Sequence, residues 1–190
     1  MKTKVILSLL ISSALLFTAC SDDEAANPEE DIQIAGLVTY EGNDFSLKMP
    51  QDWEIIEKNS FTSNVPVETV VDFRNNLKSE IFTANINLSM VAVPETQNSE
   101  DFAKSSLAQA RNSLVAFTEI AQREESVGIL VGFVTEFSGK KTALEEKIQF
   151  KQLSVVQNGV GYSLTASFLP KEDIGVVELM DAMISSFALL

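Results

Sequence analysis

Period-two alternation of apolar and polar residues is the feature that most restricts the fold of this 190-residue chain. In the clearest run, residues 82–92, apolar side chains alternate with Thr83, Asn85, Asn87 and Ser89. Because successive side chains of a strand point to opposite faces, this run predicts a strand with one buried and one polar face. Similar patterns predict a protein built mainly from antiparallel strands. They cover residues 45–49, 53–58, 67–74, 118–124, 129–137, 144–156 and 160–168.

Local signals refine the expected strands. Asn158-Gly159 is typical of a two-residue type I′ hairpin. Within residues 144–156 the apolar positions change phase after Phe150, which predicts a β-bulge near Lys151-Gln152. Ser138-Gly139 is expected to end the preceding strand.

Two segments have the spacing of amphipathic helices. In residues 99–116 apolar side chains recur every three or four positions, and Ser99-Glu100-Asp101 has the composition of an N-cap and an acidic first turn. Glu172-Asp173 opens a second helix that approaches the C-terminus. One antiparallel, twisted sheet with these two helices packed on it is the simplest arrangement, an α+β fold. We expect a single domain over residues 34–190.

Residues 1–20 have the order of parts of a secretory signal peptide. Two lysines precede an apolar stretch, residues 5–17, that is shorter than the ~20 residues a membrane-spanning helix needs. The segment ending in Ala19-Cys20 resembles the bacterial lipobox, in which a peptidase removes residues 1–19 and the thiol receives a diacylglycerol. The resemblance implies a lipoprotein anchored through Cys20. A membrane-spanning anchor and a cleaved signal with an incidental cysteine are the alternatives.

The segment after the cysteine is acidic. Residues 20–33 have no periodic apolar pattern and predict a flexible tether. In the bacterial sorting scheme Ser21 favours the outer membrane, and the run Ser21-Asp22-Asp23-Glu24 is similar to a surface-export signal. The alternative is that these acids only keep the tether solvated and away from anionic headgroups. With a formal net charge of −13, the chain is not expected to bind nucleic acid.

The side chains that most enzymes require are missing. The sequence has no histidine and one cysteine, which excludes Ser-His-Asp and Cys-His catalysis and most zinc sites. Acid pairs such as Glu124-Glu125 would point to opposite faces of a strand, and no calcium-binding loop motif is present. We therefore expect a protein that is not an enzyme and has neither a cofactor nor a metal site.

The segment Asp44–Glu54 contains the pattern Phe-Ser-Leu-x-x-Pro-x-x-Trp. It resembles the opening of the PsbP-like superfamily, which includes the DcrB-type bacterial lipoproteins. The later elements follow in a similar order through Gly161–Thr165 and Ile184–Phe187, so the resemblance covers roughly residues 43–187. It implies an α/β/α sandwich on an antiparallel sheet and a binding role, mostly toward proteins. It implies no catalytic residue.

Two functions stay open after this reasoning. The first is a lipid-anchored, non-catalytic lipoprotein of the cell envelope, at the periplasmic face or on the cell surface, that binds or scaffolds an envelope protein. Its contact residues are expected on the polar strand face or in the loops around Phe61 and Asn158. The strand-face residues are Thr83, Asn85, Asn87 and Ser89. The second is a binder of a small ligand or of a divalent cation such as calcium.

Overall fold

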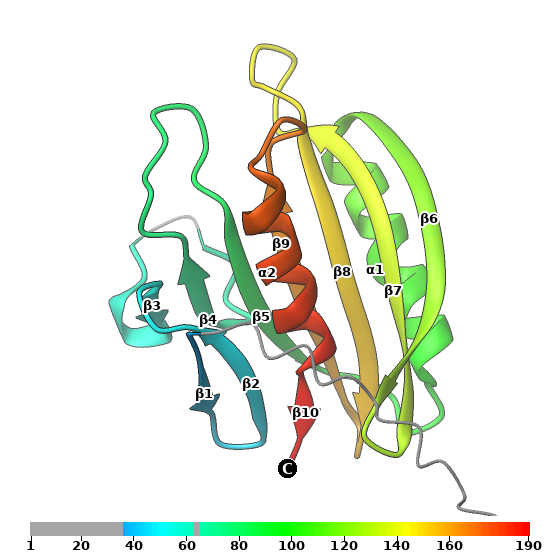
Figure 1. Ribbon diagram of the computed structural model, residues 1–190. Coiled ribbons are helices and arrows are strands. Elements are labelled where there is room, and N and C mark those ends of the chain that lie inside the picture. Colours follow the sequence, from blue (N-terminus) through cyan, green and yellow to red (C-terminus); the bar gives the residue numbers. More distant parts are fainter. Residues whose placement is uncertain (1–35, 63–64) are drawn as a thin grey trace, which may run out of the picture. The chain divides into compact units, whose positions relative to one another are not determined.

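The strands form two antiparallel sheets in the computed structural model, which describes residues 36–62 and 65–190 (Figure 1). The large sheet has the strand order β3-β4-β5-β9-β8-β7-β6. Its strands are β3 (Glu54–Glu57), β4 (Thr69–Arg74), β5 (Asn85–Ala92), β6 (Val115–Val127), β7 (Leu130–Lys140), β8 (Ile148–Gln157) and β9 (Val160–Phe168).

The remaining strands form a separate small sheet, so the expectation of one sheet is wrong in this respect. In the small sheet β2 (Phe45–Pro50) pairs on one side with β1 (Leu37–Glu41) and on the other with the C-terminal β10 (Ala188–Leu189). A 3-10 turn, η1 (Lys58–Ser60), follows β3.

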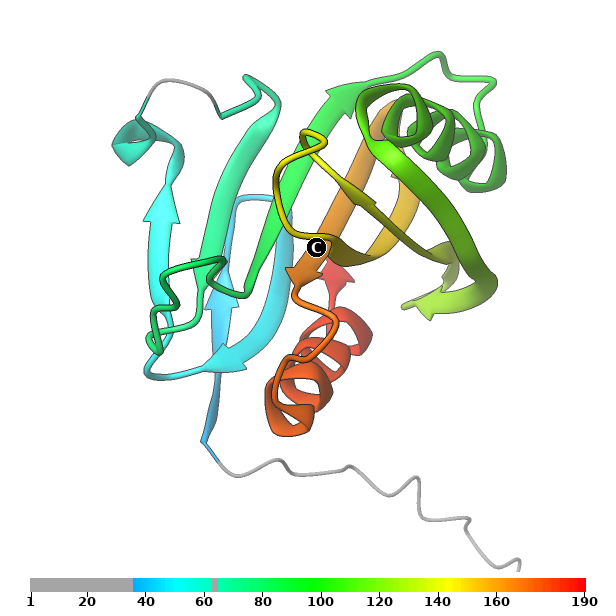
Figure 2. The same cartoon turned by 90° about the horizontal axis from the view of Figure 1, so that it is seen from above.

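The two helices lie on opposite faces of the large sheet, which confirms the predicted α+β class (Figures 1 and 2). Helix α2 (Ile174–Ser185) and strand β2 pack against one face, here called the core face. Helix α1 (Ser99–Ser113) packs against β6, β7 and β8 on the other, here called the polar face.

The core face is almost entirely apolar, as the alternation predicts. Phe73, Ile86, Leu88, Leu153 and Leu164 are fully buried on it. They contact side chains of α2 and of the small sheet in one continuous core. The core also contains Phe45, Leu47, Met49, Trp53, Met180, Met183 and Ile184.

Helix α1 is shorter than predicted. Asn98, and not Ser99, is the N-cap, and its side chain accepts a hydrogen bond of 2.8 Å from the backbone N–H of Asp101. The helix ends at Ser113 because the next residues become β6 and pair with the end of β7. Leu114 packs directly onto Gly139, where an added Cβ would lie 2.8 Å from the leucine Cβ. This contact explains why Ser138-Gly139 continues β7 and does not end it.

The predicted bulge near Lys151-Gln152 is wrong. Strand β8 begins at Ile148 and pairs with both neighbours without a register shift. The apolar phase changes although the pairing is regular, because Ile148 and Phe150 lie on the polar face whereas Leu153 and Val155 lie on the core face. Lys151, although on the core face, pairs with Asp181 of α2, its Nζ lying 2.7 Å from both carboxylate oxygens.

The predicted hairpin at Asn158-Gly159 and the predicted helix start at Glu172-Asp173 are confirmed. Both residues of the hairpin have positive φ, 52° and 75°, as a type I′ turn requires. Asp173 caps α2, because its carboxylate accepts a hydrogen bond of 2.8 Å from the backbone N–H of Gly175.

The predictions for residues 1–19 and 20–33, including Ala19 and Cys20, lie outside the described residues. Among the described residues, no helix combines the length and hydrophobicity needed to cross a bilayer.

Candidate functional site

Polar side chains on the polar face are aligned across six neighbouring strands. The strand registers place each of them directly opposite the next, so they form a continuous polar row. The row consists of Asp72, Asn87, Thr165, Gln152, Thr135 and Gln122, on β4, β5, β9, β8, β7 and β6 respectively. Hydrogen bonds join two neighbouring pairs, because Gln152 Nε2 donates to Thr165 Oγ1 at 3.0 Å and Gln122 Nε2 donates to Thr135 Oγ1 at 3.1 Å.

Helix α1 covers only part of this face. It lies over β6, β7 and β8 (Figure 2). Thr135 on β7 is buried. The phenyl ring of Phe102 reaches as far as Gly161 on β9, where an added Cβ would lie 2.6 Å from ring carbons. Within the described part of the chain, no helix lies over β3, β4 and β5 on this face (Figure 2).

The uncovered area contains seven half-buried polar residues, here called the open polar patch. They are Asp72, Arg74, Asn85, Asn87, Ser89, Ser163 and Thr165. Half-burial restricts their rotamers while leaving donors and acceptors within reach of a partner. Fixed polar groups of this kind give binding sites their orientation and specificity.

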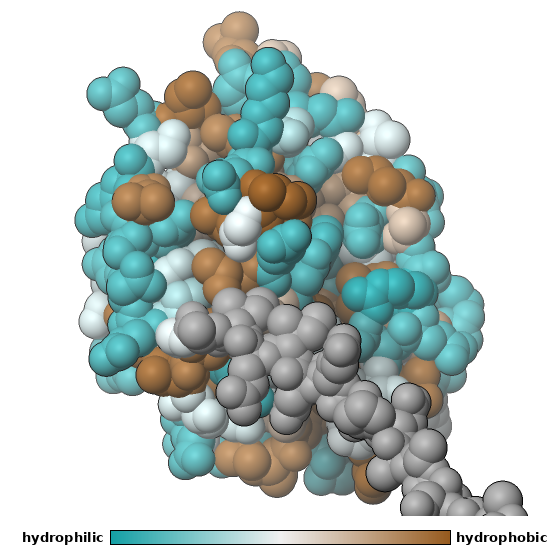
Figure 3. Space-filling model, viewed as in Figure 1, coloured by the Kyte–Doolittle hydropathy of each residue, from teal (hydrophilic) through white to brown (hydrophobic). Residues whose placement is uncertain are grey.

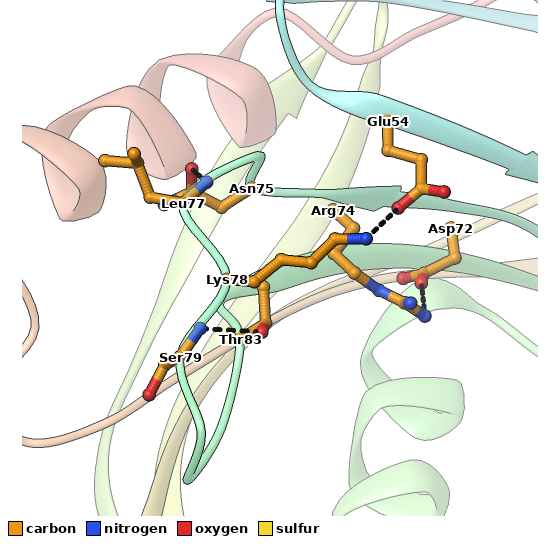
Figure 4. A network of polar contacts seen from close by, with 8 residues as sticks. All are labelled: Glu54, Asp72, Arg74, Asn75, Leu77, Lys78, Ser79 and Thr83. Atoms are coloured by element: carbon orange, nitrogen blue, oxygen red, sulfur yellow. Dashed lines mark hydrogen bonds and ion pairs between the residues drawn. The ribbon is translucent and has the colours of Figure 1, made fainter.

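An ion pair at the edge of the patch gives it a charged group. Arg74 Nη2 lies 3.2 Å from Asp72 Oδ2, and the two side chains extend side by side from β4 (Figure 4). The Asp72 side chain is 13% exposed and that of Arg74 is 40% exposed. Burial raises the pKa of Asp72 above its ordinary value, although the Arg74 charge and hydrogen bond act in the opposite direction. Arg74 keeps donors that Asp72 does not occupy.

The asparagines of the patch differ in how they are held. Asn85 Nδ2 donates to the backbone carbonyl of Thr83 at 3.0 Å, and this bond fixes its amide. The Asn87 amide, next to Asp72 and Thr165, has no hydrogen bond to another residue in the described ranges. An unpaired, half-buried amide is ready to bind a polar group from outside.

The structure brings together part of the predicted contact set. Asn85 and Asn87 lie on one face with Ser89, as the alternation predicts. Phe61 is half-buried beyond η1, at the end of β3 away from Asn85. The sequence reasoning missed Asp72 and Arg74, whose alternation with buried Val71 and Phe73 already places them on a polar face.

Two other features bear on the small-ligand alternative. A pocket of 270 Å³ lies between the β1–β2 hairpin and η1, and its lining includes Tyr40, Glu57 and Lys58. This volume is below the range typical of ligand sites, roughly 300–1,000 Å³. Burial, with a smaller contribution from Glu57, raises the pKa of Tyr40. Among the described residues, no three acids lie close enough together to hold a metal ion.

Solved structures similar to this one share its fold. A cyanobacterial PsbP (CyanoP) from Synechocystis sp. PCC 6803 matches with a TM-score of 0.60 at 15% identity, over 84% of this chain and 96% of that one. LpqN of Mycobacterium tuberculosis, described as involved in cell envelope biogenesis, matches with a TM-score of 0.56 at 13% identity, over 80% and 88%.

The Ran-binding protein Mog1p of Saccharomyces cerevisiae matches with a TM-score of 0.52 at 11% identity, over 80% of this chain and 93% of that one. No family model and no curated protein sequence matches the chain. The similarity therefore lies in the fold, which is PsbP-like, as the opening motif predicted.

Proposed function

We propose that this protein is a non-catalytic binding module of the cell envelope, anchored through a lipid on Cys20, that holds a protein partner on the open polar patch. The observation that carries the proposal is the amide of Asn87, which has no hydrogen-bond partner among the described residues and lies between Asp72 and Thr165 in a row of otherwise paired polar side chains. A PsbP-like fold supports a binding role because the similar structures include one named as Ran-binding and one named for envelope biogenesis.

The chemistry of the patch indicates what kind of surface it binds. Its side chains are amides, hydroxyls, one carboxylate and one guanidinium, and an amphipathic helix would find no apolar groove among them. A polar segment that presents backbone N–H and C=O groups would be hydrogen-bonded well. A carboxylate of the partner would be bound by the Arg74 donors that Asp72 leaves open.

Binding on this patch is tested by recovering partners from the envelope after mild crosslinking. Asn87→Ala removes the free amide, whereas Asn112→Ala removes an exposed asparagine from α1, at the other side of the polar face. We expect a partner that is retained by the parent protein and by Asn112→Ala and is lost with Asn87→Ala. Equal recovery with both variants would rule out the patch as the contact.

The lipid anchor is tested separately. The intact mass of the protein from the membrane fraction should exceed that of residues 20–190 by the mass of the acyl groups. Cys20→Ala should keep residues 1–19 and carry no added mass. An intact mass equal to that of unmodified residues 20–190 would contradict the lipid anchor. It would not affect the interpretation of the partner experiment.

A small-ligand role is the second candidate, and the pocket beside Tyr40 is the observation that favours it. A ligand that binds only the folded state raises the melting temperature. A screen of metabolites and of calcium with the parent and with Tyr40→Phe would detect such a ligand. If a compound raised the melting temperature of the parent and of Tyr40→Phe equally, its binding site would lie outside this pocket.

A further inference from the structure

Strand β6 forms one margin of the large sheet, and among the described residues no strand lies on its outer side (Figure 1). It has 13 residues and is the longest strand of the sheet. An edge strand presents a row of N–H and C=O groups with which a further strand can pair. The opposite margin, β3, has only four residues, and its two charged residues are both acids. Strand β6 is therefore the margin that offers more backbone for pairing.

The two halves of β6 differ in regularity. In the first half the register with β7 shifts twice, between Val115 and Thr118 and between Glu119 and Ala121. Irregularities of this kind twist an edge away from a neighbouring strand. From Ala121 to Val127 the pairing with β7 is unbroken over seven residues. This stretch, here called the regular edge, is longer than an average strand of about five to six residues.

The regular edge is exposed and charged. Five of its seven residues are exposed, and its charged residues are Arg123, Glu124 and Glu125. Because side chains alternate along a strand, Arg123 and Glu125 lie on one face and Glu124 lies on the other. Hydrophilic side chains predominate along this margin, at the right of the space-filling view (Figure 3). Association along the regular edge would therefore depend on strand pairing and charge, and not on an apolar patch.

A second copy of the chain fits the regular edge in one register. Two identical antiparallel strands are related by a two-fold axis that sets one residue opposite its own copy. With the axis at Glu124, the midpoint of the stretch, all seven residues pair. An axis at Arg123 or Glu125 would set two like charges opposite each other, and an axis at Gln122 or Ser126 would pair no opposite charges.

The register centred on Glu124 is complementary in charge. It sets Arg123 of each copy opposite Glu125 of the other, so that two cross-strand pairs of opposite charge form. Arg123 also pairs with Glu125 of its own chain, and its side chain is 52% exposed. A guanidinium has five N–H donors and can bond to both carboxylates. Opposite charges across a strand pair stabilise it, whereas the two Glu124 side chains on the axis weaken it.

We propose that two copies of this chain pair antiparallel along the regular edge, with the two-fold axis at Glu124. The two large sheets then form one continuous sheet. Because the axis is perpendicular to the sheet, both polar faces lie on the same side of the dimer. The open polar patch lies on β4, β5 and β9, away from the axis, and stays uncovered. The dimer therefore presents two patches on one side, which favours partners that carry two matching surfaces.

Sedimentation velocity of residues 20–190 with Cys20→Ser tests the association, since this chain has no thiol and carries no lipid. We expect a reversible dimer. Arg123→Glu should weaken dimerisation by about tenfold, because two attractive contacts become repulsive. Adding Glu125→Arg should restore the dimer, because the exchanged charges form both contacts again. Lys48→Glu, on β2 of the small sheet, makes the same change in net charge as Arg123→Glu and should leave the dimer unchanged.

Disulfide formation tests the register. Residues directly opposite in an antiparallel pair have Cα atoms about 4.5–5.5 Å apart, a separation that a disulfide can bridge. In the Cys20→Ser background, Glu124→Cys should oxidise to a covalent dimer, because the axis sets position 124 opposite its own copy. Gln122→Cys, also exposed, should not, because it lies opposite Ser126 of the other copy.

The two experiments together can overturn the proposal. A chain that stays monomeric at every concentration would contradict it. So would a dimer that Arg123→Glu does not weaken or that Glu125→Arg does not restore. A covalent dimer that is absent at position 124, or that forms equally at positions 122 and 124, would contradict the register.

Discussion

The two faces of the large sheet differ in what covers them and in what they contain. The core face is buried by α2 and the small sheet, and most of its central strand positions are filled by buried apolar side chains. The polar face is covered by one helix, α1, whose own buried residues are only Phe102, Ala103 and Leu107. Beyond this helix, half-buried polar groups of the sheet stay uncovered. The first face therefore holds the domain together, whereas the second leaves polar groups available for the binding that we propose.

The largest difference is expected from truncating a core-face residue. Phe73 on β4 is fully buried, while its neighbour Asp72 points to the other face. Phe73→Ala removes a packed ring and should lower the free energy of unfolding by about 3–5 kcal/mol. Urea denaturation measures this loss. Asn87→Ala on the polar face is the comparison, and we expect it to change the free energy of unfolding much less. If both variants lowered the free energy of unfolding equally, the core face would not be the source of the stability.

A moderate effect is expected where α1 meets the sheet. A Cβ at Gly161 would lie 2.6 Å from the Phe102 ring, so Gly161→Ala should cost about 1–3 kcal/mol by overpacking. The additional replacement Phe102→Leu should recover part of this loss, because it removes the clashing ring atoms. The absence of any recovery in urea denaturation would show that α1 is not held by this contact.

A smaller effect is expected at the ion pair on the core face. Lys151 is 17% exposed at its side chain and is paired with Asp181, so Asp181→Asn should cost about 1–2 kcal/mol by leaving a partly buried ammonium without its carboxylate. The double variant Lys151→Met with Asp181→Leu should be close to the parent in stability, because apolar replacements of such pairs are often neutral. A double variant less stable than Asp181→Asn would contradict this account.

The smallest effect on stability is expected on the polar face, and it depends on pH. The pKa of Asp72 is raised in the folded state, so the folded protein binds this proton more tightly than the unfolded chain does. The stabilisation that this tighter proton binding gives to the folded state is complete below the ordinary pKa of 3.8. It is lost as the pH rises through the raised pKa of Asp72.

Asp72→Asn should remove this dependence and slightly stabilise the protein at neutral pH. Urea midpoints of both proteins between pH 4 and pH 7 measure the difference. A variant whose stability falls relative to the parent as the pH rises would show that the Arg74 pair outweighs burial.

The sequence predicted the strands well and their partners less well. Alternation in residues 82–92 and 160–168 reports a local property, which face of a strand is buried. The strand at 160–168 formed as expected, and the strand predicted at 82–92 formed from Asn85 to Ala92. The separate small sheet and the end of α1 depend on contacts between distant segments, such as β10 with β2 and Leu114 with Gly139. No local pattern encodes those contacts.

The candidate site shows the same limit. Asn85 and Asn87 were predicted because they share a strand with an obvious pattern. Asp72 joins them only through the β4–β5 register, and Thr165 only through the β5–β9 register. The resemblance of Asp44–Glu54 to the PsbP-like opening supplied the topology that residue patterns alone did not.

Site-specific photocrosslinking tests the central claim most directly. A photoreactive phenylalanine analogue replaces Asn87 in the open polar patch or, as the control, Asn112 on α1, and the cells are irradiated before the envelope is isolated. We predict a discrete protein adduct from position 87 that is absent from position 112. Adducts of equal yield from both positions, or none from position 87, would contradict the assignment of the polar face as the binding surface.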